Sequence, residues 1–393
     1  MTTGGTVKVG LHARTQEISG DLELLDHLGQ DGFAWIRDGA GFVTSGVAAR
    51  ACVEGVADLL ATIDVDGSDG PPGRWPIAVG ALPFDDAAAG ELVVPARVVW
   101  RSADGDGWIT EIGPAETDPD DRVRALPSPG RFSVRPGLER DAWTGSVGAV
   151  LDAIEEGRVR KVVLARKVLA EADQPFDRTA VIARLAHSHP ECFTFAAGGL
   201  VGASPELLLR RTGRQVESCP MAGTSAPTDA DQLHGSIKNR AEHHSVVTAV
   251  AEALGPVCEQ LAVPDAPEVR SFPTVAHLVS CLTGVLRPPA PSALELACRL
   301  HPTPAVGGAP TDAARNLIAT LERMRRGSYA GPVGWVDGNG DGEWAVALRC
   351  AEIQGRKATL FAGAGIVEGS DPDEEWVETQ RKLEPMLAAL IRP

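Results

Sequence analysis

Hydrophobic and polar positions follow helical and strand-like patterns along this chain, most clearly after residue 130. Apolar residues spaced three and four apart indicate segments with one buried helical face. They predict helices over 142–156, 178–188, 236–254, 293–300 and 312–325, and a last helix from about 371. Runs rich in Val and Leu between Gly-rich turns predict strands over 159–170, 192–197, 206–211, 215–219, 329–336, 343–353 and 357–367. Strands in hairpin order, with helices between the groups, predict an α+β fold with mainly antiparallel sheets.

The start of the last helix is well marked. Asp371 suits the N-cap position, Pro372 suits the first helical position, and Glu374 follows three residues after the cap. We therefore expect the helix to begin here.

The first third of the chain is less regular. Its weakly alternating segments, such as 91–94 and 96–100, predict an α/β scaffold without a recognisable chemical motif. Residues 115–131 are acidic, rich in Pro and without periodicity, so they are the best candidate for a linker.

Charge and composition narrow the class of partner. The chain has 393 residues, with 37 Lys and Arg against 53 Asp and Glu, which gives a net charge of −16. A negative field disfavours nucleic acid and anionic membrane surfaces, so neither partner is expected. The sequence has no run of 18 apolar residues and no basic stretch followed by an apolar core at its start, so we expect a cytoplasmic protein. No coiled-coil pattern or apolar stripe indicates a partner chain, and a monomer is expected.

The seven cysteines do not suggest a metal or disulfide framework. Their number is odd, no two form a C-x-x-C pair, and most lie in apolar segments. The sequence therefore predicts free, buried thiols in a reducing compartment.

The predicted strand around 343–351 has an unusual pair of faces. Trp344, Val346, Leu348 and Cys350 alternate with small residues and a single Arg349. A floor of small side chains with one guanidinium suits a pocket for a compact anion, because Arg matches the geometry of a carboxylate. The alternative is that Arg349 forms a salt bridge with a covering helix.

Acidic residues on the last helix indicate a cation site. Glu375 and Glu378 are three residues apart and share a face, and Lys382 lies four residues further on. Two such carboxylates, with a third from another helix such as Glu242, could hold Mg²⁺ through oxygen. Spacing alone favours a solvated charged face with ordinary ion pairs.

Two ionisable residues lie beside apolar strand residues. Lys161 begins a run of Val and Leu, and Glu206 precedes three Leu residues. Burial should lower the pKa of the lysine and raise that of the glutamate, so the pair could act as base and acid near neutral pH. The alternative is that both cap strand ends in water.

These segments, read in chain order, resemble the chorismate-utilising enzymes, which comprise isochorismate, salicylate, anthranilate and aminodeoxychorismate synthases. The resemblance covers roughly 130–393 as the catalytic region and is loose over 1–125, an α/β portion of the same fold. It implies two large, mainly antiparallel sheets packed together with helices outside. The matching motifs are Lys161-Val-Val-Leu-Ala-Arg166, Gly202-Ala-Ser-Pro-Glu206-Leu, Met221-Ala-Gly-Thr224, Glu242-His243, Thr274-Val-Ala-His277-Leu, His301-Pro-Thr-Pro-Ala-Val306, Tyr329-Ala-Gly-Pro-Val-Gly-Trp335, Arg349, Gly363-Ala-Gly365-Ile-Val, and Glu375 with Glu378.

Single positions indicate which reaction to expect. Family members that add water resemble this chain in having Lys161, where anthranilate synthases typically have Gln. Aminodeoxychorismate enzymes have a nucleophilic lysine in place of Ala222. Water is therefore the expected nucleophile, and no glutamine amidotransferase partner is expected. Salicylate synthases tend to have Thr where this chain has Ala305, and they share Tyr329. Ala305 carries more weight, because a hydroxyl at that position would help to orient the pyruvate side chain. Isochorismate synthase is therefore the preferred interpretation, salicylate synthase is the alternative, and anthranilate synthase is less favoured.

The resemblance also implies the roles of the site residues. Lys161 is the expected base and Glu206 the expected acid, while Mg²⁺ on Glu242, Glu375 and Glu378 would hold the ring carboxylate of chorismate. The expected substrate contacts are Gly223, Thr224, His277, Ala305, Val306, Tyr329, Arg349, Gly363, Ala364, Gly365 and Lys382. Whether the product serves siderophore, menaquinone or other salicylate-derived synthesis is left open.

Overall fold

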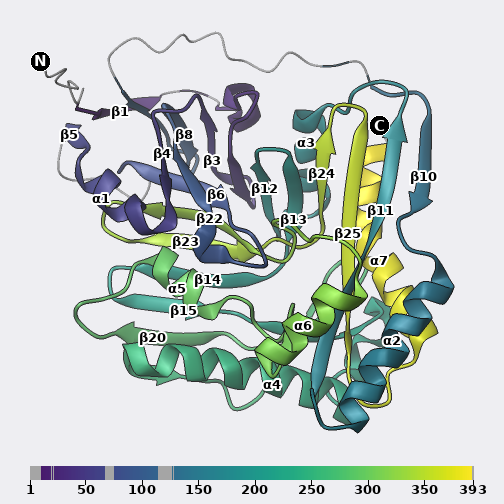
Figure 1. The fold of residues 1–393 in the computed structure, drawn as a ribbon. Helices are drawn as coiled ribbons and strands as arrows, with labels where there is room; N and C mark the ends of the chain where they lie inside the picture. The colour runs from purple at the N-terminus through teal and green to yellow at the C-terminus, as the bar shows by residue number, and fades with distance from the viewer. Residues whose placement is uncertain are drawn as a thin grey trace, which may run out of the picture.

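Two large β-sheets form the framework of the protein, shown in Figure 1. The computed structural model describes residues 10–18, 20, 22–66, 75–113, 126 and 128–391. The first sheet has thirteen strands, of which β21 (Gly308–Ala309) pairs with β11 off the main order. The others run in the order β10 (Phe132–Pro136), β11 (Lys161–Ala172), β25 (Lys357–Ile366), β24 (Cys350–Gln354), β13 (Leu200–Ser204), β12 (Phe193–Ala197), β2 (Ala34–Arg37), β3 (Ala40–Ser45), β8 (Arg97–Arg101), β9 (Gly107–Ile112), β1 (His12–Ile18) and β5 (Asp64–Asp66).

The second sheet has nine strands, and a small third sheet has three. The nine run in the order β17 (Cys258–Ala262), β20 (Leu282–Leu286), β15 (Gln215–Ser218), β14 (Leu207–Thr212), β23 (Gly342–Val346), β22 (Pro332–Asp337), β6 (Ile77–Ala81), β7 (Glu91–Val94) and β4 (Ala49–Cys52). The third sheet holds β16 (Met221–Ser225), β19 (Ala276–Val279) and β18 (Glu268–Ser271). Among the described residues every strand pair is antiparallel except β1 with β5.

The helices lie on the outside of the sheets (Figure 1). Helix α7 packs on β25, α2 and α3 pack on α7, α4 packs on β16, and α5 packs on β14. Their bounds, with the short α1, are α1 (Val56–Ala61), α2 (Arg140–Glu155), α3 (Arg178–Ser188), α4 (Ile237–Leu254), α5 (Ala293–Leu300), α6 (Thr311–Leu321) and α7 (Pro372–Ile391). The predicted α+β fold with outer helices is confirmed, and α3 and α5 have the bounds predicted from the sequence.

The two large sheets share an aromatic core. Phe42 on β3 and Trp100 on β8 belong to the first sheet, and both meet the ring of Trp335 on β22 of the second, edge to face, with centroids 6.1 and 5.6 Å apart. Such contacts add to the hydrophobic gain from burial. The sheets are therefore packed face to face through residues of both the first third and the last third of the chain.

Strands of the first third extend both large sheets. Strand β2 pairs with β12, and β6 pairs with β22. The described residues before 114 contain nine strands and one six-residue α-helix, so this part is richer in strands than the α/β scaffold expected from the sequence. Residues 114–125 and 127, most of the predicted linker, lie outside the described residues.

The predicted strand over 343–353 is wrong. Strand β23 ends at Val346 in the nine-stranded sheet, and β24 begins at Cys350 in the thirteen-stranded sheet. Between them the Leu348 N–H donates to the Val346 carbonyl, and Arg349 has a φ of 48°. The two-residue alternation therefore stops at 346, and no Gly or Pro marks the change. Arg349 lies at a crossing between sheets rather than on a strand face.

The last helix begins where the sequence predicts. The Asp371 carboxylate accepts the N–H groups of Asp373 and Glu374, as an N-cap should. No helix in the described part of the chain is long and apolar enough to cross a membrane.

The prediction of free, buried cysteines is wrong at four positions. Cys219 and Cys281 form a disulfide, Cys52 is exposed, and Cys298 is only partly buried. Ser218 pairs with Leu282 in the ladder between β15 and β20, so the two cysteines occupy the next rung, with Cα atoms 4.1 Å apart. Their separation of 62 residues hides this proximity in the sequence.

Candidate active site

Lys161 is buried at the start of β11, with 4% of its side chain exposed. Its Nζ donates to Glu242 Oε1 on α4 at 2.8 Å. The side chain crosses Gly365 of β25, where an added Cβ would lie only 2.9 Å from Lys161 Cε and 2.8 Å from Glu242 Oε1. Gly365 is therefore the residue that leaves room for this ion pair.

Glu206 lies between β13 and β14 and is 4% exposed. Its backbone N–H donates to Ser204 Oγ, which holds the segment after Pro205. Burial raises the pKa of the Glu206 carboxyl to about 7, although the Met221 N–H and two lysines, 161 and 382, partly oppose the shift. The raised pKa has the direction predicted from the sequence, and it leaves this group partly protonated at neutral pH.

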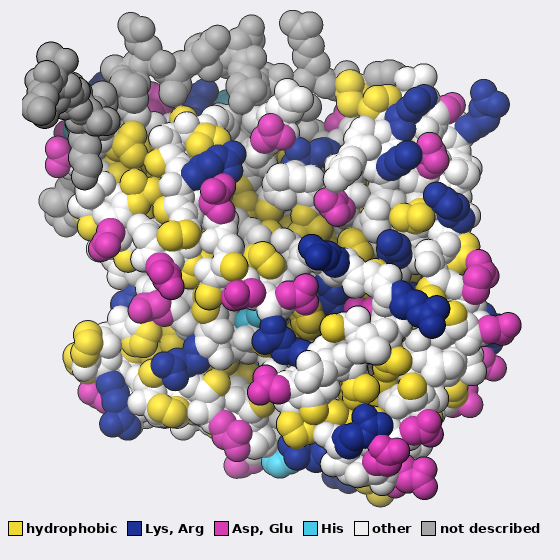
Figure 2. Space-filling model, in the orientation of Figure 1, with side chains coloured by type: hydrophobic (Ala, Val, Ile, Leu, Met, Phe, Trp, Pro, Cys, Tyr) yellow, Lys and Arg dark blue, Asp and Glu magenta, His cyan; other side chains and the backbone are white. Residues whose placement is uncertain are grey.

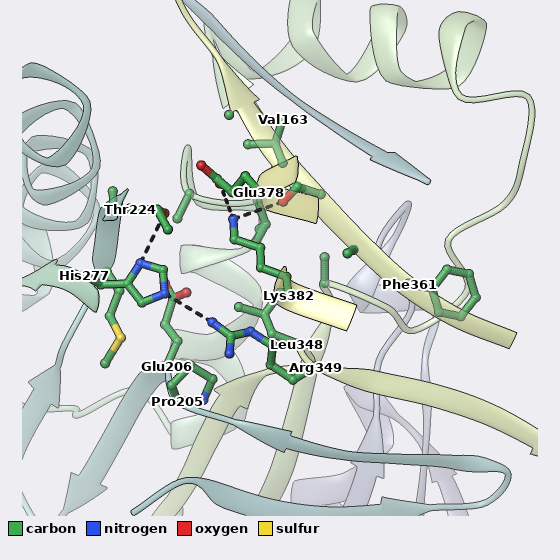
Figure 3. Close-up of a pocket in the computed structure, with 18 of the residues that line it drawn as sticks. Val163, Pro205, Glu206, Thr224, His277, Leu348, Arg349, Phe361, Glu378 and Lys382 are labelled. Carbon is green, nitrogen blue, oxygen red and sulfur yellow. Dashed lines mark hydrogen bonds and ion pairs between the residues drawn. The ribbon is translucent and has the colours of Figure 1, made fainter. Parts of the chain in front are cut away.

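A cavity of about 70 Å³ joins most of the predicted site residues. Figure 3 shows Glu206, Thr224, His277, Arg349 and Lys382 directed toward one another from different elements. The candidates lining it are Glu206, Gly223, Thr224, Glu242, His277, Ala305, Val306, Tyr329, Arg349, Gly363, Gly365, Glu378 and Lys382.

Three candidates do not line this cavity. Lys161 reaches its edge through the bond to Glu242. Glu375 lines an adjoining hollow, and Ala364 is fully buried between two cavity-lining glycines of β25. Because side chains alternate along a strand, the Ala364 methyl points away from the cavity.

The end of the cavity near β24 offers an unpaired cation. Arg349 is 9% exposed, and among the described residues it has no ion-pair partner. Its Nη2 donates to His277 Nε2 at 3.2 Å. Burial and the nearby Arg349 charge lower the pKa of His277 to about 3, so the imidazole is neutral. Its Nδ1 lies 3.1 Å from the Gly223 carbonyl, which fixes the proton on Nδ1 and leaves Nε2 to accept.

An adjoining hollow of about 560 Å³ brings the three predicted metal ligands together. It shares Thr224, Glu242, Gly365 and Glu378 with the first cavity and adds Glu375. Burial and the neighbouring Glu378 carboxylate raise the pKa of Glu375. A divalent cation would relieve this repulsion, and carboxylate oxygens suit Mg²⁺, so the donor set fits such an ion.

Each of these carboxylates is held by its own lysine. The ion pairs are Glu242 with Lys161 at 2.8 Å, Glu375 with Lys238 at 3.2 Å, and Glu378 with Lys382 at 2.6 Å. Among the described residues, the one group of three possible metal-binding atoms within 4.8 Å of one another is Glu217 with Cys219 and Cys281, whose sulfurs are already joined in the disulfide. The three glutamates therefore share a hollow without forming a preassembled cage, and they would have to turn from their lysines to share an ion.

Comparison with known proteins identifies the family. A sequence model of the family described as "Chorismate binding enzyme" matches residues 117–391, which contain every candidate residue. The chain belongs to the chorismate-binding enzyme family. This chorismate-binding enzyme is 39% identical over 334 residues to isochorismate synthase DhbC of Bacillus subtilis, covering 80% of this chain and 81% of that protein.

Further relatives extend the likeness. Isochorismate synthase EntC of Escherichia coli is 36% identical to the enzyme over 325 residues, covering 79% of this chain and 80% of that protein. The solved structure of MenF, described as the menaquinone-specific isochorismate synthase of Escherichia coli, matches with a TM-score of 0.83 at 26% identity, covering 97% of this chain and 95% of that chain. The family resemblance seen in the sequence is thus confirmed.

Sequence reasoning missed one buried cation in the cavity wall. Arg326 lines the cavity and is 3% exposed. In the sequence it stands four residues after Glu322, at the end of the helix predicted over 312–325, and therefore looks like a surface ion pair. Helix α6 ends at Leu321, so both residues lie beyond it.

Proposed function

We propose that this enzyme is an isochorismate synthase, which converts chorismate to isochorismate by adding water at C2 with loss of the C4 hydroxyl. The observation that carries the proposal is Glu206, a buried carboxyl with a pKa of about 7, in a cavity that Lys382 lines and whose edge Lys161 reaches through Glu242. Curated isochorismate synthases that align over about four fifths of the chain support the same reaction.

The two ionisable groups have complementary roles. To act as the base, Lys161 must give up its ion pair with Glu242 and be the neutral amine; it then takes a proton from water as the water oxygen forms the new bond to C2. The ring double bond shifts as the C4–O bond breaks, and Glu206 donates its proton to the departing hydroxyl, which leaves as water. The reaction consumes and releases one water, so the atoms balance. General acid and base groups of this kind contribute about 10²- to 10⁴-fold each.

The remaining side chains bind the two carboxylates of chorismate. Arg349 is a buried guanidinium whose side-chain partner among the described residues is a neutral imidazole, so a substrate carboxylate supplies the missing anion. Lys382 adds a second positive charge and donates to the Gly363 carbonyl at 3.0 Å. The ring of Tyr329 stacks on that of Phe361, with centroids 5.1 Å apart, and the two rings form part of the cavity wall. We place His277 near the C4 hydroxyl, and Ala305 and Val306 beside the attacking water.

We assign Mg²⁺ to Glu242, Glu375 and Glu378. When bound, the ion neutralises the ring carboxylate and draws electron density from the ring. The surface charge of −16 does not prevent binding of a dianion, because salt at ~0.15 M screens exposed charges beyond about 8 Å. On the face in Figure 2, acidic and basic side chains are interspersed.

Tyr329 also keeps salicylate synthase as a second candidate, since the resemblance associates a tyrosine here with pyruvate elimination. The test is chromatography of the products formed from chorismate and Mg²⁺, with salicylate fluorescence recorded in parallel. Isochorismate without salicylate, formed in water without ammonia or a glutaminase, is the expected result. Salicylate would favour the second candidate, and unchanged chorismate would refute both.

Metal dependence is checked on the same enzyme. Removal of divalent ions with EDTA should stop turnover, and Mg²⁺ should restore it. Calorimetric titration of Glu378→Gln with Mg²⁺ should show weaker binding than the wild type, because one charged oxygen ligand is lost. Equal Mg²⁺ affinity in the two proteins would contradict this ligand assignment.

A further inference from the structure

The middle of one edge of β11 is hydrogen-bonded by side chains and not by a neighbouring strand. On this edge β21 pairs with residues 161–162, and β10 pairs with residues 168–172. Between them the Ala165 N–H donates to Glu322 Oε1 at 2.7 Å, and the Val163 carbonyl accepts from Arg326 Nη2 at 2.8 Å. Arg326 and Glu322 therefore satisfy backbone groups that no neighbouring strand reaches. These groups lie two and four residues after Lys161, respectively.

The same guanidinium also holds a wall of the cavity. Arg326 Nη1 donates to the Val306 carbonyl at 2.7 Å, and Nε donates to Glu322 Oε2 at 3.0 Å. Its planar group lies over the Phe84 ring, 4.2 Å from the centroid. One side chain thus joins the strand of Lys161, the loop of Val306 and a phenylalanine of the first third of the chain.

The pair is buried and charged. Arg326 is 3% exposed and Glu322 is 6% exposed. Burial alone would lower the pKa of Arg326, but the Glu322 carboxylate more than offsets it and the net pKa is raised, so the guanidinium keeps its charge and all its donors. Its rigid fork can reach three acceptors in different directions, which a lysine ammonium on a flexible stem cannot reproduce.

We propose that Glu322 and Arg326 are a positioning pair that fixes the Ala305–Val306 wall relative to Lys161, so that the attacking water is held between base and substrate. This rests on the proposed function. Replacing only the charges of an ion pair by apolar residues can cost little stability, whereas replacing this pair also leaves the Ala165 N–H and the Val163 and Val306 carbonyls without their partners, so a variant that lacks both charges should be less stable. A positioning pair could not be replaced in this way without loss of rate, because a displacement of 1 Å in a reacting group can cost about 10²-fold.

The experiment compares variants of Arg326 and Glu322 with variants of a more exposed ion pair away from the cavity. Arg326→Lys keeps the charge, and the double variant Arg326→Met with Glu322→Leu removes both charges while keeping apolar volume. The control replaces the ion pair of Arg210 and Glu343 in the same way, because it joins β14 to β23 and neither residue lines the cavity. Isochorismate formation gives kcat and KM for each protein, and thermal unfolding gives the midpoint temperature.

We expect both site variants to lose kcat by about 10- to 100-fold, with KM for chorismate within about threefold of the wild type, since Arg326 holds the water side and not the carboxylates. Control variants should keep wild-type kcat. Addition of millimolar guanidinium to Arg326→Ala should raise its kcat, and it should not raise that of Arg210→Ala.

Three results would overturn the inference. They are wild-type kcat in the folded double variant, an equal loss of kcat in the control, and a rise in KM with kcat unchanged. A wild-type enzyme that makes no isochorismate would instead refute the proposed function, so the two failures are distinguishable.

Discussion

Replacing Glu206 by glutamine should make the enzyme slower and, at alkaline pH, more stable. The carboxyl is buried, and its pKa rises from 4.5 to about 7, mainly through loss of solvation. Glutamine keeps the size of the side chain but can neither donate a proton as an acid nor ionise. The rate should fall by about 10²- to 10⁴-fold, the usual contribution of general acid catalysis.

The stability gain follows from linkage. The shift of the pKa from 4.5 to about 7 is about 2.5 units, and each unit corresponds to about 1.36 kcal/mol. Below pH 4.5 the carboxyl is protonated in both folded and unfolded chains and costs nothing. Between pH 4.5 and about 7 the unfolded chain ionises while the folded carboxyl keeps its proton, so the wild type progressively loses up to about 3 kcal/mol of stability, and the loss levels off above the folded pKa. Glu206→Gln escapes this loss.

Urea unfolding at several pH values between 4.5 and 8 tests the reasoning. The difference in unfolding free energy between Glu206→Gln and the wild type should grow from pH 4.5 to about 7 and then level off. Glu352→Gln is the control for the change of Glu to Gln itself, because Glu352 is exposed on β24. The wild-type kcat/KM should also fall about tenfold per pH unit above about pH 7. A pH-independent stability difference, or Glu206→Gln with unaltered activity, would refute the reasoning.

Three further predictions concern single features of the structure. Lys161→Ala should abolish hydration while the far-ultraviolet circular dichroism stays native, and turnover within about tenfold of the wild type would exclude Lys161 as the base. Arg349→Lys should raise KM for chorismate by about 10- to 100-fold, since a lost hydrogen bond to a charged group is worth about 1.5–3 kcal/mol; an unchanged KM would place the carboxylate elsewhere. Replacing both Cys219 and Cys281 by Ala should lower the unfolding free energy by about 4 kcal/mol, from the entropy of a loop closed over 62 residues. Urea unfolding of the double variant and of the reduced wild type, each compared with the oxidised wild type, measures this loss. An unchanged unfolding free energy in both would contradict the prediction.

The sequence predicts helices and strands well where each lies within one sheet or on one face. Strand β11 and helices α3 and α5 repeat one pattern throughout, so their periodicity is enough to locate them. The strand predicted over 343–353 failed because its chain passes from one sheet to the other at Arg349 without a turn residue. Periodicity reports which side chains alternate, and it carries no information about which sheet a residue joins.

The candidate site, like the fold, could be predicted from the sequence only in part. Family motifs select the residues that line the cavity, from Glu206 to Lys382. They do not reveal which partners these residues have, because pairs such as Lys161 with Glu242 join positions 81 residues apart. Arg326 was missed for a related reason. Its spacing from Glu322 is that of an ordinary exposed helical pair, and only the end of α6 at Leu321 turns both residues inward.

The continuation of both sheets into the first third of the chain has a practical consequence for fragments. A protein starting at residue 117, where the family match begins, would lack β2 and β6 and would leave β12 and β22 as open edges. Trp335 would lose its aromatic neighbours, and Arg326 would lose Phe84 beneath its guanidinium. Open apolar edges recruit other chains, so such a truncation should precipitate on expression, and a co-expressed piece covering residues 1–116 should rescue it.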